Sequence, residues 1–310
     1  MKILVTGGAG FIGSHVADAF IGQGHEVVIL DNLSTGRKEN VNAHAQFVKM
    51  NIQDPEIMDL FEQEQFDVVD HHAAQMDVRL SVADPIYDAN NNILGTINLL
   101  QASVKYGVKK FIFISSGGAI YGEHDYFPAD EEHPTRPLSP YGITKLSCEK
   151  YLYFYFKTHR LNFVILRYSN VYGPRQNPHG EAGVVAIFAS RLLTGEQPII
   201  NGNGIQTRDY VYVGDAVTAN LKALEYNNND YFNIGTGIET TVNELFDSIN
   251  HLTNAGIEEV YGPAQPGEQL RSVLDIQKAK KLLNWNPQVS LDEGLAKTVE
   301  YFKQYHKQEG

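Results

Sequence analysis

KILVTGGAGFIG, residues 2–13, joins an apolar run to a glycine-rich turn and to the start of an amphipathic stretch. Lys2–Thr6 is typical of a buried strand, and Ile12–Gln23 has the spacing of a helix. A glycine-rich pattern alone is a weak signal, but it becomes a strong one between a first strand and a first helix. The segment therefore predicts the opening strand, turn and helix of a dinucleotide-binding fold.

Three glycines of this turn have different tasks in such a fold. Gly7 permits the tight turn, Gly10 lets the backbone approach a pyrophosphate, and Gly13 allows the helix to pack closely on the strand. The backbone N–H groups and the positive end of the helix dipole then face the phosphates.

The second strand, Glu26–Leu30, ends in Asp31. A carboxylate at that place accepts hydrogen bonds from an unmodified ribose and repels a 2′-phosphate, so NAD is favoured over NADP. Asn32, Ser34 and Gly36 follow and are placed to close over the adenosine. The alternative is a plain tight turn and a helix cap, but the expected separation between the glycines and Asp31 argues against it.

Strand-like and helix-like segments alternate through the first half of the chain. The strand-like segments are Lys2–Thr6, Glu26–Leu30, Phe47–Lys49, Phe66–His71, Lys110–Ser115 and Asn162–Arg167, and the helix-like ones are Ile12–Gln23, Glu56–Glu64, Pro85–Tyr106 and a helix that begins near Pro140. This alternation implies parallel strands joined by right-handed crossovers. We expect an α/β fold with a Rossmann-type doubly wound parallel sheet.

Beyond Tyr172 the pattern becomes irregular and turn residues become frequent, as in Asn201–Gly204. We expect a smaller α/β substrate-binding lobe here. The predicted division gives residues 1–171 to an NAD-binding Rossmann domain, with a returning strand near residues 231–234, and residues 172–310 mainly to the second lobe. No glycine/serine linker separates them, which favours a cleft between joined lobes.

The composition limits the classes of function. The 310 residues carry a formal charge of -12, which argues against a nucleic-acid-binding protein because phosphate contacts need a basic face. The single cysteine, Cys148, excludes an intrachain disulfide and fits a cytoplasmic location. We expect no signal peptide and no membrane span. The 11 histidines show no metal-ligand spacing, so no metal is expected.

Tyr141 and Lys145 are four residues apart in SPYGITK, residues 139–145, where Pro140 suits the first turn of a helix. Both side chains then point to one helix face. A free tyrosine has a pKa of about 10 and is a poor base at neutral pH. A nearby ammonium and a cationic nicotinamide would favour the phenolate. The pair is commonplace on surface helices, but its position downstream of a dinucleotide turn favours a catalytic role.

These residues carry a resemblance to the extended short-chain dehydrogenase/reductase family, and within it to the UDP-glucose 4-epimerases. The Gly-x-x-Gly-x-x-Gly spacing also points to this family. The likeness covers nearly the whole chain and includes Gly7–Gly13, Asp31–Gly36, Ala73-Ala74-Gln75, Asn91–Thr96, Ser115–Gly122, Tyr141 with Lys145, Leu166–Gly173, Arg208-Asp209-Tyr210 and Pro266-Gly267-Glu268.

The resemblance implies NAD as cofactor and a set of residues that contact it. That set is Gly7, Gly10, Phe11, Ile12, Gly13, Asp31, Asn32, Ser34, Gly36, Asn51, Ile52, Ala73, Ala74, Gln75, Asn91, Ser115, Tyr141, Lys145 and Tyr168. Members of the family usually form homodimers by packing two helices of each subunit together. The corresponding segments are around Asn91–Tyr106 and Tyr141–His159, so a homodimer is expected.

The sequence departs from the family at the usual catalytic hydroxyl. Counted back from Tyr121-Gly122, that hydroxyl falls on Gly117. Ser116 is the nearest substitute, but neighbours on an extended strand face opposite ways. Ser116 therefore reaches a substrate only if Gly117-Gly118 bends the backbone; otherwise the role is empty or filled by water. The acidic residues that related dehydratases place at 118 and 119 are also missing, which disfavours dehydration.

The resemblance places the nucleotide sugar against the second lobe. Arg208 resembles the arginine that clamps the diphosphate. Relatives often have an arginine where this chain has Gln265; either Arg271 compensates for it, or phosphate binding is weaker. Ser272 stands where a bulky residue restricts some epimerases to unacetylated sugars. The full set of expected substrate residues is Ser116, Tyr141, Asn170, Val184, Arg208, Arg271 and Ser272.

The reaction that the resemblance implies is the NAD-dependent 4-epimerisation of a UDP-hexose through a transient 4-keto sugar. Tyr141, Lys145 and Ser116 are the expected catalytic residues. UDP-GlcNAc and UDP-GalNAc are expected to react beside UDP-glucose and UDP-galactose, because Ser272 is small. The alternatives are an epimerase of UDP-uronates or UDP-pentoses, a dehydratase or reductase of nucleotide sugars, and a non-catalytic NAD-binding protein on the same fold.

Overall fold

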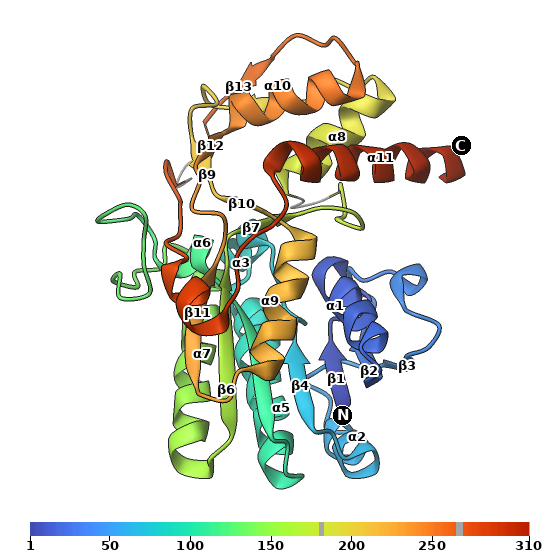
Figure 1. Cartoon of the computed structure of the whole chain (residues 1–310), viewed down its shortest axis with the longest axis vertical. Coiled ribbons are helices and arrows are strands. Elements are labelled where there is room, and N and C mark those ends of the chain that lie inside the picture. Colours follow the sequence, from blue (N-terminus) through green and yellow to red (C-terminus); the bar gives the residue numbers. More distant parts are fainter. Residues whose placement is uncertain (180–182, 265–268, 310) are drawn as a thin grey trace.

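A sheet of seven parallel strands forms the centre of the molecule (Figure 1). The computed structural model describes residues 1–179, 183–264 and 269–309. From edge to edge the strands are β11 (Asp230–Ile234), β6 (Asn162–Tyr168), β5 (Lys110–Ser116), β4 (Val68–His71), β1 (Lys2–Thr6), β2 (Glu26–Asp31) and β3 (Gln46–Lys49). The order reverses between β1 and β4, and such a switch point opens a ligand crevice at the carboxyl ends of the strands. The predicted fold class and the returning strand are confirmed.

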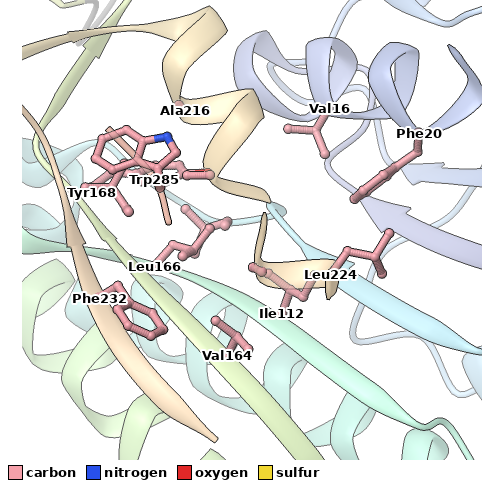
Figure 2. Packing of buried hydrophobic residues seen from close by; sticks show 14 of the residues in the cluster. Val16, Phe20, Ile112, Val164, Leu166, Tyr168, Ala216, Leu224, Phe232 and Trp285 are labelled. Carbon is pink, nitrogen blue, oxygen red and sulfur yellow. The ribbon is translucent and has the colours of Figure 1, made fainter. Parts of the chain in front are cut away.

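Helices cover both faces of this sheet, which is why the strands contain continuous apolar runs such as Val27–Leu30 and Phe163–Leu166. On one face lie α1 (Phe11–Gly22) and α9 (Val213–Glu225), which bury a cluster that includes Val16, Phe20 and Leu166 (Figure 2). On the other face lie α2 (Ile57–Glu64), α5 (Gly95–Lys105) and α7 (Pro140–His159), around a second cluster.

The segment predicted as one helix from Pro85 to Tyr106 is helical but not uniform. It consists of α4 (Pro85–Ala89), a π-helical turn η2 (Asn90–Leu94) and α5, and the short helix α3 (Val78–Ala83) precedes it. A π-helical turn inserts an extra residue and rotates the faces of the helix that follows. The turn lies in the stretch that carries Asn91 and Asn92.

A smaller lobe above the sheet contains α8 (Val184–Thr194), α10 (Val242–Thr253) and α11 (Leu291–Glu309), which share a third core cluster (Figure 1). The remaining elements are short: η1 (Lys38–Asn40), α6 (Gly117–Ile120), η3 (Ala279–Leu283) and the strand pairs β7 (Asn170–Tyr172) with β10 (Tyr210–Tyr212), β9 (Thr207–Arg208) with β12 (Thr240–Thr241), and β8 (Ile200–Asn201) with β13 (Tyr261–Gly262). Among the described residues, no helix is long and apolar enough to cross a membrane.

The chain passes between the sheet and the smaller lobe several times after Tyr172. Helix α9 and strand β11 return to the sheet, and Trp285 is buried in the cluster under α9 (Figure 2). The predicted division at residue 171 therefore describes the first passage of the chain and stays an interpretation.

Candidate active site

The glycine turn between β1 and α1 has no room for side chains. Gly7 has a φ of +67°, and a Cβ on it would lie 2.7 Å from the backbone nitrogen of Ala73. A Cβ on Gly13 would lie 2.4 Å from the carbonyl oxygen of Gly7, and one on Gly10 would lie 3.1 Å from it. Closely packed backbone at the start of a helix is the cradle that a pyrophosphate requires. The described residues therefore fit a dinucleotide.

Asp31 ends β2 beside this cradle. Its carboxylate accepts hydrogen bonds from the backbone nitrogens of Ala9, at 3.0 Å, and Leu33, at 2.8 Å. A Cβ on Gly36 would come within 2.8 Å of the same carboxylate, so the loop can close over Asp31 because residue 36 is glycine. Oxygens of an ionised carboxylate can each accept further hydrogen bonds, which leaves Asp31 able to hold a ribose.

Strand β5 ends at Ser116 and the chain turns at once into α6, which begins at Gly117. This bend places the Ser116 hydroxyl close enough to the Tyr141 phenol to lower the pKa of that phenol. The bend that the sequence required for Ser116 to reach the site is present. A Cβ on Gly117 would lie 2.6 Å from Cδ1 of Leu274, so the usual hydroxyl residue does not fit at position 117 in this packing.

Lys145 lies one helical turn after Tyr141 on α7 and is buried. Its Nζ donates a 2.8 Å hydrogen bond to the carbonyl of Ile114 and lies 5.8 Å from the centre of the Tyr141 ring. Burial lowers the pKa of Lys145 to about 8. Lys145 is therefore tied to β5 and can change its charge in the range in which most enzymes work.

Burial raises the pKa of Tyr141 to about 12, and the hydrogen bond from Ser116 opposes this shift. Lys145 is not among the groups that shift this pKa, so the expected lowering of the pKa by Lys145 is not found, and burial is the largest effect. The hydroxyl of Ser116 favours the phenolate instead. The cationic nicotinamide remains the other group expected to favour it.

A buried ion pair supports the catalytic helix from behind. Glu149, one turn beyond Lys145, receives two hydrogen bonds from the guanidinium of Arg167 on β6, at 3.0 and 2.6 Å, and one from the hydroxyl of Ser115, at 2.6 Å. Each side chain of the ion pair is 4% exposed. These bonds fix α7 relative to β5 and β6.

Asn92, in the π-helical turn, links two predicted parts of the site. Its side-chain oxygen accepts a hydrogen bond from the backbone nitrogen of Gln75, at 2.8 Å, and its Nδ2 donates to the carbonyl of Gln75, at 2.9 Å. The same Nδ2 lies 3.2 Å from Oγ1 of Thr144, the neighbour of Lys145. Asn92 thus joins the loop after β4 to the catalytic helix.

Asp209 organises the substrate side of the same edge. Its buried carboxylate accepts hydrogen bonds from the backbone and hydroxyl of Thr236, both at 2.7 Å, and from the backbone of Gly237, at 3.0 Å. Its carbonyl accepts one from the backbone nitrogen of Asn170, at 2.9 Å. Asp209 therefore fixes Asn170 and its own neighbour Arg208.

Asn170 lies beside the turn that carries Ser116. A Cβ on Gly118 would be 3.8 Å from the side-chain oxygen of Asn170 and 4.0 Å from Oγ of Ser116. Arg208 is half-buried and donates a 2.8 Å hydrogen bond to the carbonyl of Thr207. The structure thus brings Ser116, Tyr141 and Asn170 to one edge of the sheet.

A model of the NAD dependent epimerase/dehydratase family matches residues 3–235. The chain belongs to this family. It is 50% identical to a putative UDP-glucose 4-epimerase of Methanocaldococcus jannaschii over 97% of this chain and 98% of that protein. A crystal structure of the UDP-glucose 4-epimerase of Thermotoga maritima with UDP-glucose matches at 52% identity and a TM-score of 0.97, covering 99% of this chain and 100% of that one. The Thermus thermophilus UDP-glucose 4-epimerase, in complex with NAD, matches at 44% identity and a TM-score of 0.93, covering 98% and 99%.

NAD is the cofactor of the family. Two of the side chains expected to contact it lie next to Asp31. Asn32 and Asn51 are joined by a 2.8 Å hydrogen bond between their side chains near Asp31. Three other expected side chains are used within the protein. Ser115 donates to Glu149, the Tyr168 phenol is bonded to Asn220 under α9, and Asn91 donates to the carbonyl of Tyr87, so their contacts to NAD stay predictions.

The expected substrate residues of the second lobe differ in how the structure places them. Arg271 forms a double hydrogen bond with Glu239, at 2.9 and 2.7 Å, and its guanidinium lies 3.9 Å from the centre of the Phe127 ring. Its use for a diphosphate would require this pair to open. Ser272 is 3% exposed. Val184 begins α8, and Gln265 and Pro266–Glu268 lie outside the described residues.

Proposed function

We propose that the chain catalyses the NAD-dependent 4-epimerisation of a UDP-hexose, interconverting UDP-glucose and UDP-galactose. The observation that carries the proposal is the placement of Tyr141 and Lys145 one helical turn apart on α7, with the Ser116 hydroxyl acting on the Tyr141 phenol, near the switch point of the sheet. The matched proteins named as UDP-glucose 4-epimerases support the choice of substrate.

The chain's own residues account for the movement of one proton. Tyr141, as phenolate, accepts the proton of the sugar's 4-hydroxyl, and Ser116 stabilises the charged phenolate by its hydrogen bond. The glycine turn and Asp31 would hold NAD, which when bound would supply the acceptor for the C4 hydride and the source from which that hydride is returned. The 4-keto sugar turns over between these events, and Tyr141 gives its proton back. Bond by bond, C4 regains a hydride on the face opposite to the one that lost it, and O4 regains a proton.

We propose the following residues as the site. The glycine turn and Asp31 hold the pyrophosphate and the adenosine ribose, together with the other expected cofactor residues. Ser116, Tyr141 and Asn170 surround the sugar, with Val184 and Arg208 on the uridine and diphosphate. Arg271 and Ser272 complete the proposal for the second lobe.

A coupled assay tests the reaction. UDP-galactose is supplied, and the UDP-glucose formed is oxidised by UDP-glucose dehydrogenase, which releases NADH. A Tyr141→Phe variant should still bind NAD and lose the rate by about 10²–10⁴-fold, the usual contribution of a positioned acid or base. Full epimerase rate in that variant contradicts the proposed base. Net NADH formation without the coupling enzyme would indicate a dehydrogenase or reductase instead.

The small side chain of Ser272 favours a second substrate pair, UDP-GlcNAc and UDP-GalNAc. A panel of UDP-glucose, UDP-GlcNAc, UDP-glucuronate and UDP-xylose distinguishes the candidates. We expect turnover of the first two. Turnover of UDP-glucose with none of UDP-GlcNAc at saturation would show that the small residue at 272 does not admit the acetamido group.

We propose that the chain forms a homodimer through α4, η2 and α7. These elements expose large apolar side chains, which are Ile86, Tyr87, Leu94, Ile143, Tyr153 and Phe154. Such a concentration of exposed apolar side chains is typical of a protein interface. Sedimentation should give twice the monomer mass, and Phe154→Glu should shift it toward the monomer. From the resemblance to the family, we also propose a cytoplasmic location and the division into two domains.

A further inference from the structure

Arg37 connects the loop after β2 to the C-terminal helix. Its Nη1 donates a 2.6 Å hydrogen bond to the hydroxyl of Tyr305 on α11, and its guanidinium lies 5.1 Å from the centre of that ring. A charged donor makes a hydrogen bond roughly twice as strong as a neutral one. The side chain of Arg37 is 29% exposed, so solvent screens the bond only in part.

The backbone of the same loop holds the glycine turn. The nitrogen of Arg37 donates a 2.9 Å hydrogen bond to the carbonyl of Ala9, and Nδ2 of Asn40 donates to the same carbonyl at 3.1 Å. The nitrogen of Ala9 in turn donates to Asp31 at 3.0 Å. Residues 31–40 and the turn therefore form one hydrogen-bonded unit, on which the adenosine and pyrophosphate are expected to lie.

Tyr305 belongs to the smaller lobe. Helix α11 buries Leu295, Val299 and Phe302 in the cluster that it shares with α8 and α10, and the Tyr305 ring stacks on Tyr301 at 6.2 Å between centroids. The hydroxyl of Tyr305 is thus carried by the packed lobe and reaches across to a loop of the cofactor half.

The two parts meet here across a pocket rather than a packed core. The pocket, of about 460 Å³, is lined by Arg37, Glu39, Asn40 and Arg175 and, from α11, by Tyr301, Gln304 and Tyr305. Arg175 bonds to Asp18 and Ser14, so that contact anchors α1 and not the loop. The Arg37–Tyr305 hydrogen bond therefore links the two parts at the edge of this pocket.

We propose that the Arg37–Tyr305 hydrogen bond is a clasp by which the smaller lobe holds the cofactor loop closed and slows the release of NAD. The use of such a clasp rests on the proposed function, because an epimerase recovers its hydride at each turnover and has no need to exchange NAD. Arg37 and Tyr305 act as positioning residues through the loop. Breaking their bond frees residues 32–40 to move away from Ala9.

The release rate of NAD from the purified holoenzyme tests the clasp. Released NAD is trapped by excess alcohol dehydrogenase and ethanol, and the NADH formed is followed by its absorbance. Tyr305→Phe keeps the ring and its stacking on Tyr301 but removes the acceptor, and we expect release to become about tenfold faster. Arg37→Met should have the same effect. The double variant should release NAD no faster than either single variant, because each of the three variants loses the same Arg37–Tyr305 hydrogen bond.

Tyr261→Phe is the matched control, since it removes an exposed tyrosine hydroxyl that bonds Glu259 in the same lobe. Its release rate should equal that of the unaltered chain. Unchanged release in Tyr305→Phe overturns the clasp. So does faster release that merely follows a loss of stability, measured by urea unfolding of the NAD-free variants. An unaltered chain without epimerase activity would remove the proposed function but leave this readout valid.

Discussion

The hydroxyl of Ser116 lowers the pKa of the Tyr141 phenol, although the two residues come from different elements, the end of β5 and the start of α7. The contact exists because the chain bends at Gly117 directly after the strand. It is the interaction that lowers the pKa of Tyr141, against the larger effect of burial. Ser116, one residue before the place of the family's usual hydroxyl, is therefore the residue that we propose for its chemical task.

Ser116→Ala should slow epimerisation most at low pH. Without the hydrogen bond, the pKa of Tyr141 rises further, so a smaller fraction is phenolate at any pH below it. A rise of about one pKa unit reduces the rate about tenfold near neutral pH. The rising limb of the pH–rate profile should move to higher pH. Ser147→Ala on the same helix, whose hydroxyl bonds the carbonyl of Ile143, is the control; equal profiles for both variants would contradict the role of Ser116.

Lys145→Met should abolish activity and yet stabilise the protein at neutral pH. The pKa of Lys145 falls from 10.5 to about 8 on folding because the ammonium is buried. The unfolded chain therefore binds more protons between pH 8 and 10.5, and the stability of the unaltered chain rises with pH in that window. Below pH 8 the buried charge costs about 3 kcal/mol, which methionine avoids. The variant also loses the hydrogen bond from Lys145 to the carbonyl of Ile114, which offsets part of this gain.

Urea unfolding at pH 7 and at pH 10 checks this expectation. The stability difference between Lys145→Met and the unaltered chain should shrink at the higher pH. Lys150→Met, an exposed position on α7, should show no such dependence. If the stability gain of Lys145→Met over the unaltered chain were smaller at pH 7 than at pH 10, the assigned cost of the buried charge would be wrong.

Gly117→Ser should not improve the enzyme, although it restores the family's usual hydroxyl. The new Cβ would lie 2.6 Å from Cδ1 and 3.0 Å from Cδ2 of Leu274, which is fully buried. Overpacking of this kind costs about 1–3 kcal/mol. Leu274→Val shortens the obstructing side chain, so the double variant should be more stable than the two single losses predict. Thermal unfolding of all four proteins measures the coupling, and additive losses would show that Leu274 is not the obstacle.

The sequence predicts the sheet and the catalytic pair because both depend on local pattern. The apolar runs and the glycine turn define β1, α1 and β2, and the spacing of Tyr141 and Lys145 places them on one helix face. It does not predict that Asn92, rather than Asn91, joins the loop after β4 to the catalytic helix. That choice depends on the π-helical turn, which shifts the helix faces by one residue and leaves no local signature.

The local sequence pattern also does not predict contacts between segments that are distant in the chain. Arg271 was expected to bind phosphate, but it pairs with Glu239, 32 residues earlier in the chain. The obstruction of position 117 by Leu274 also depends on a loop that reaches the turn only in the folded chain. Both interactions follow from packing of the second lobe against the edge of the sheet.

Glu149→Gln should be the most destabilising of the polar changes considered. Glu149 and Arg167 are each 4% exposed, and the carboxylate receives both guanidinium bonds and the Ser115 hydroxyl. Glutamine leaves the Arg167 charge buried without its partner, which costs about 3–5 kcal/mol. Glu293→Gln removes the pair with Lys297, whose side chains are 54% and 48% exposed, and should change stability by less than about 1 kcal/mol. Urea unfolding compares the two. Equal effects would mean that water reaches the Arg167 guanidinium once the carboxylate is gone, and that α7 does not depend on this ion pair for its position against β5 and β6.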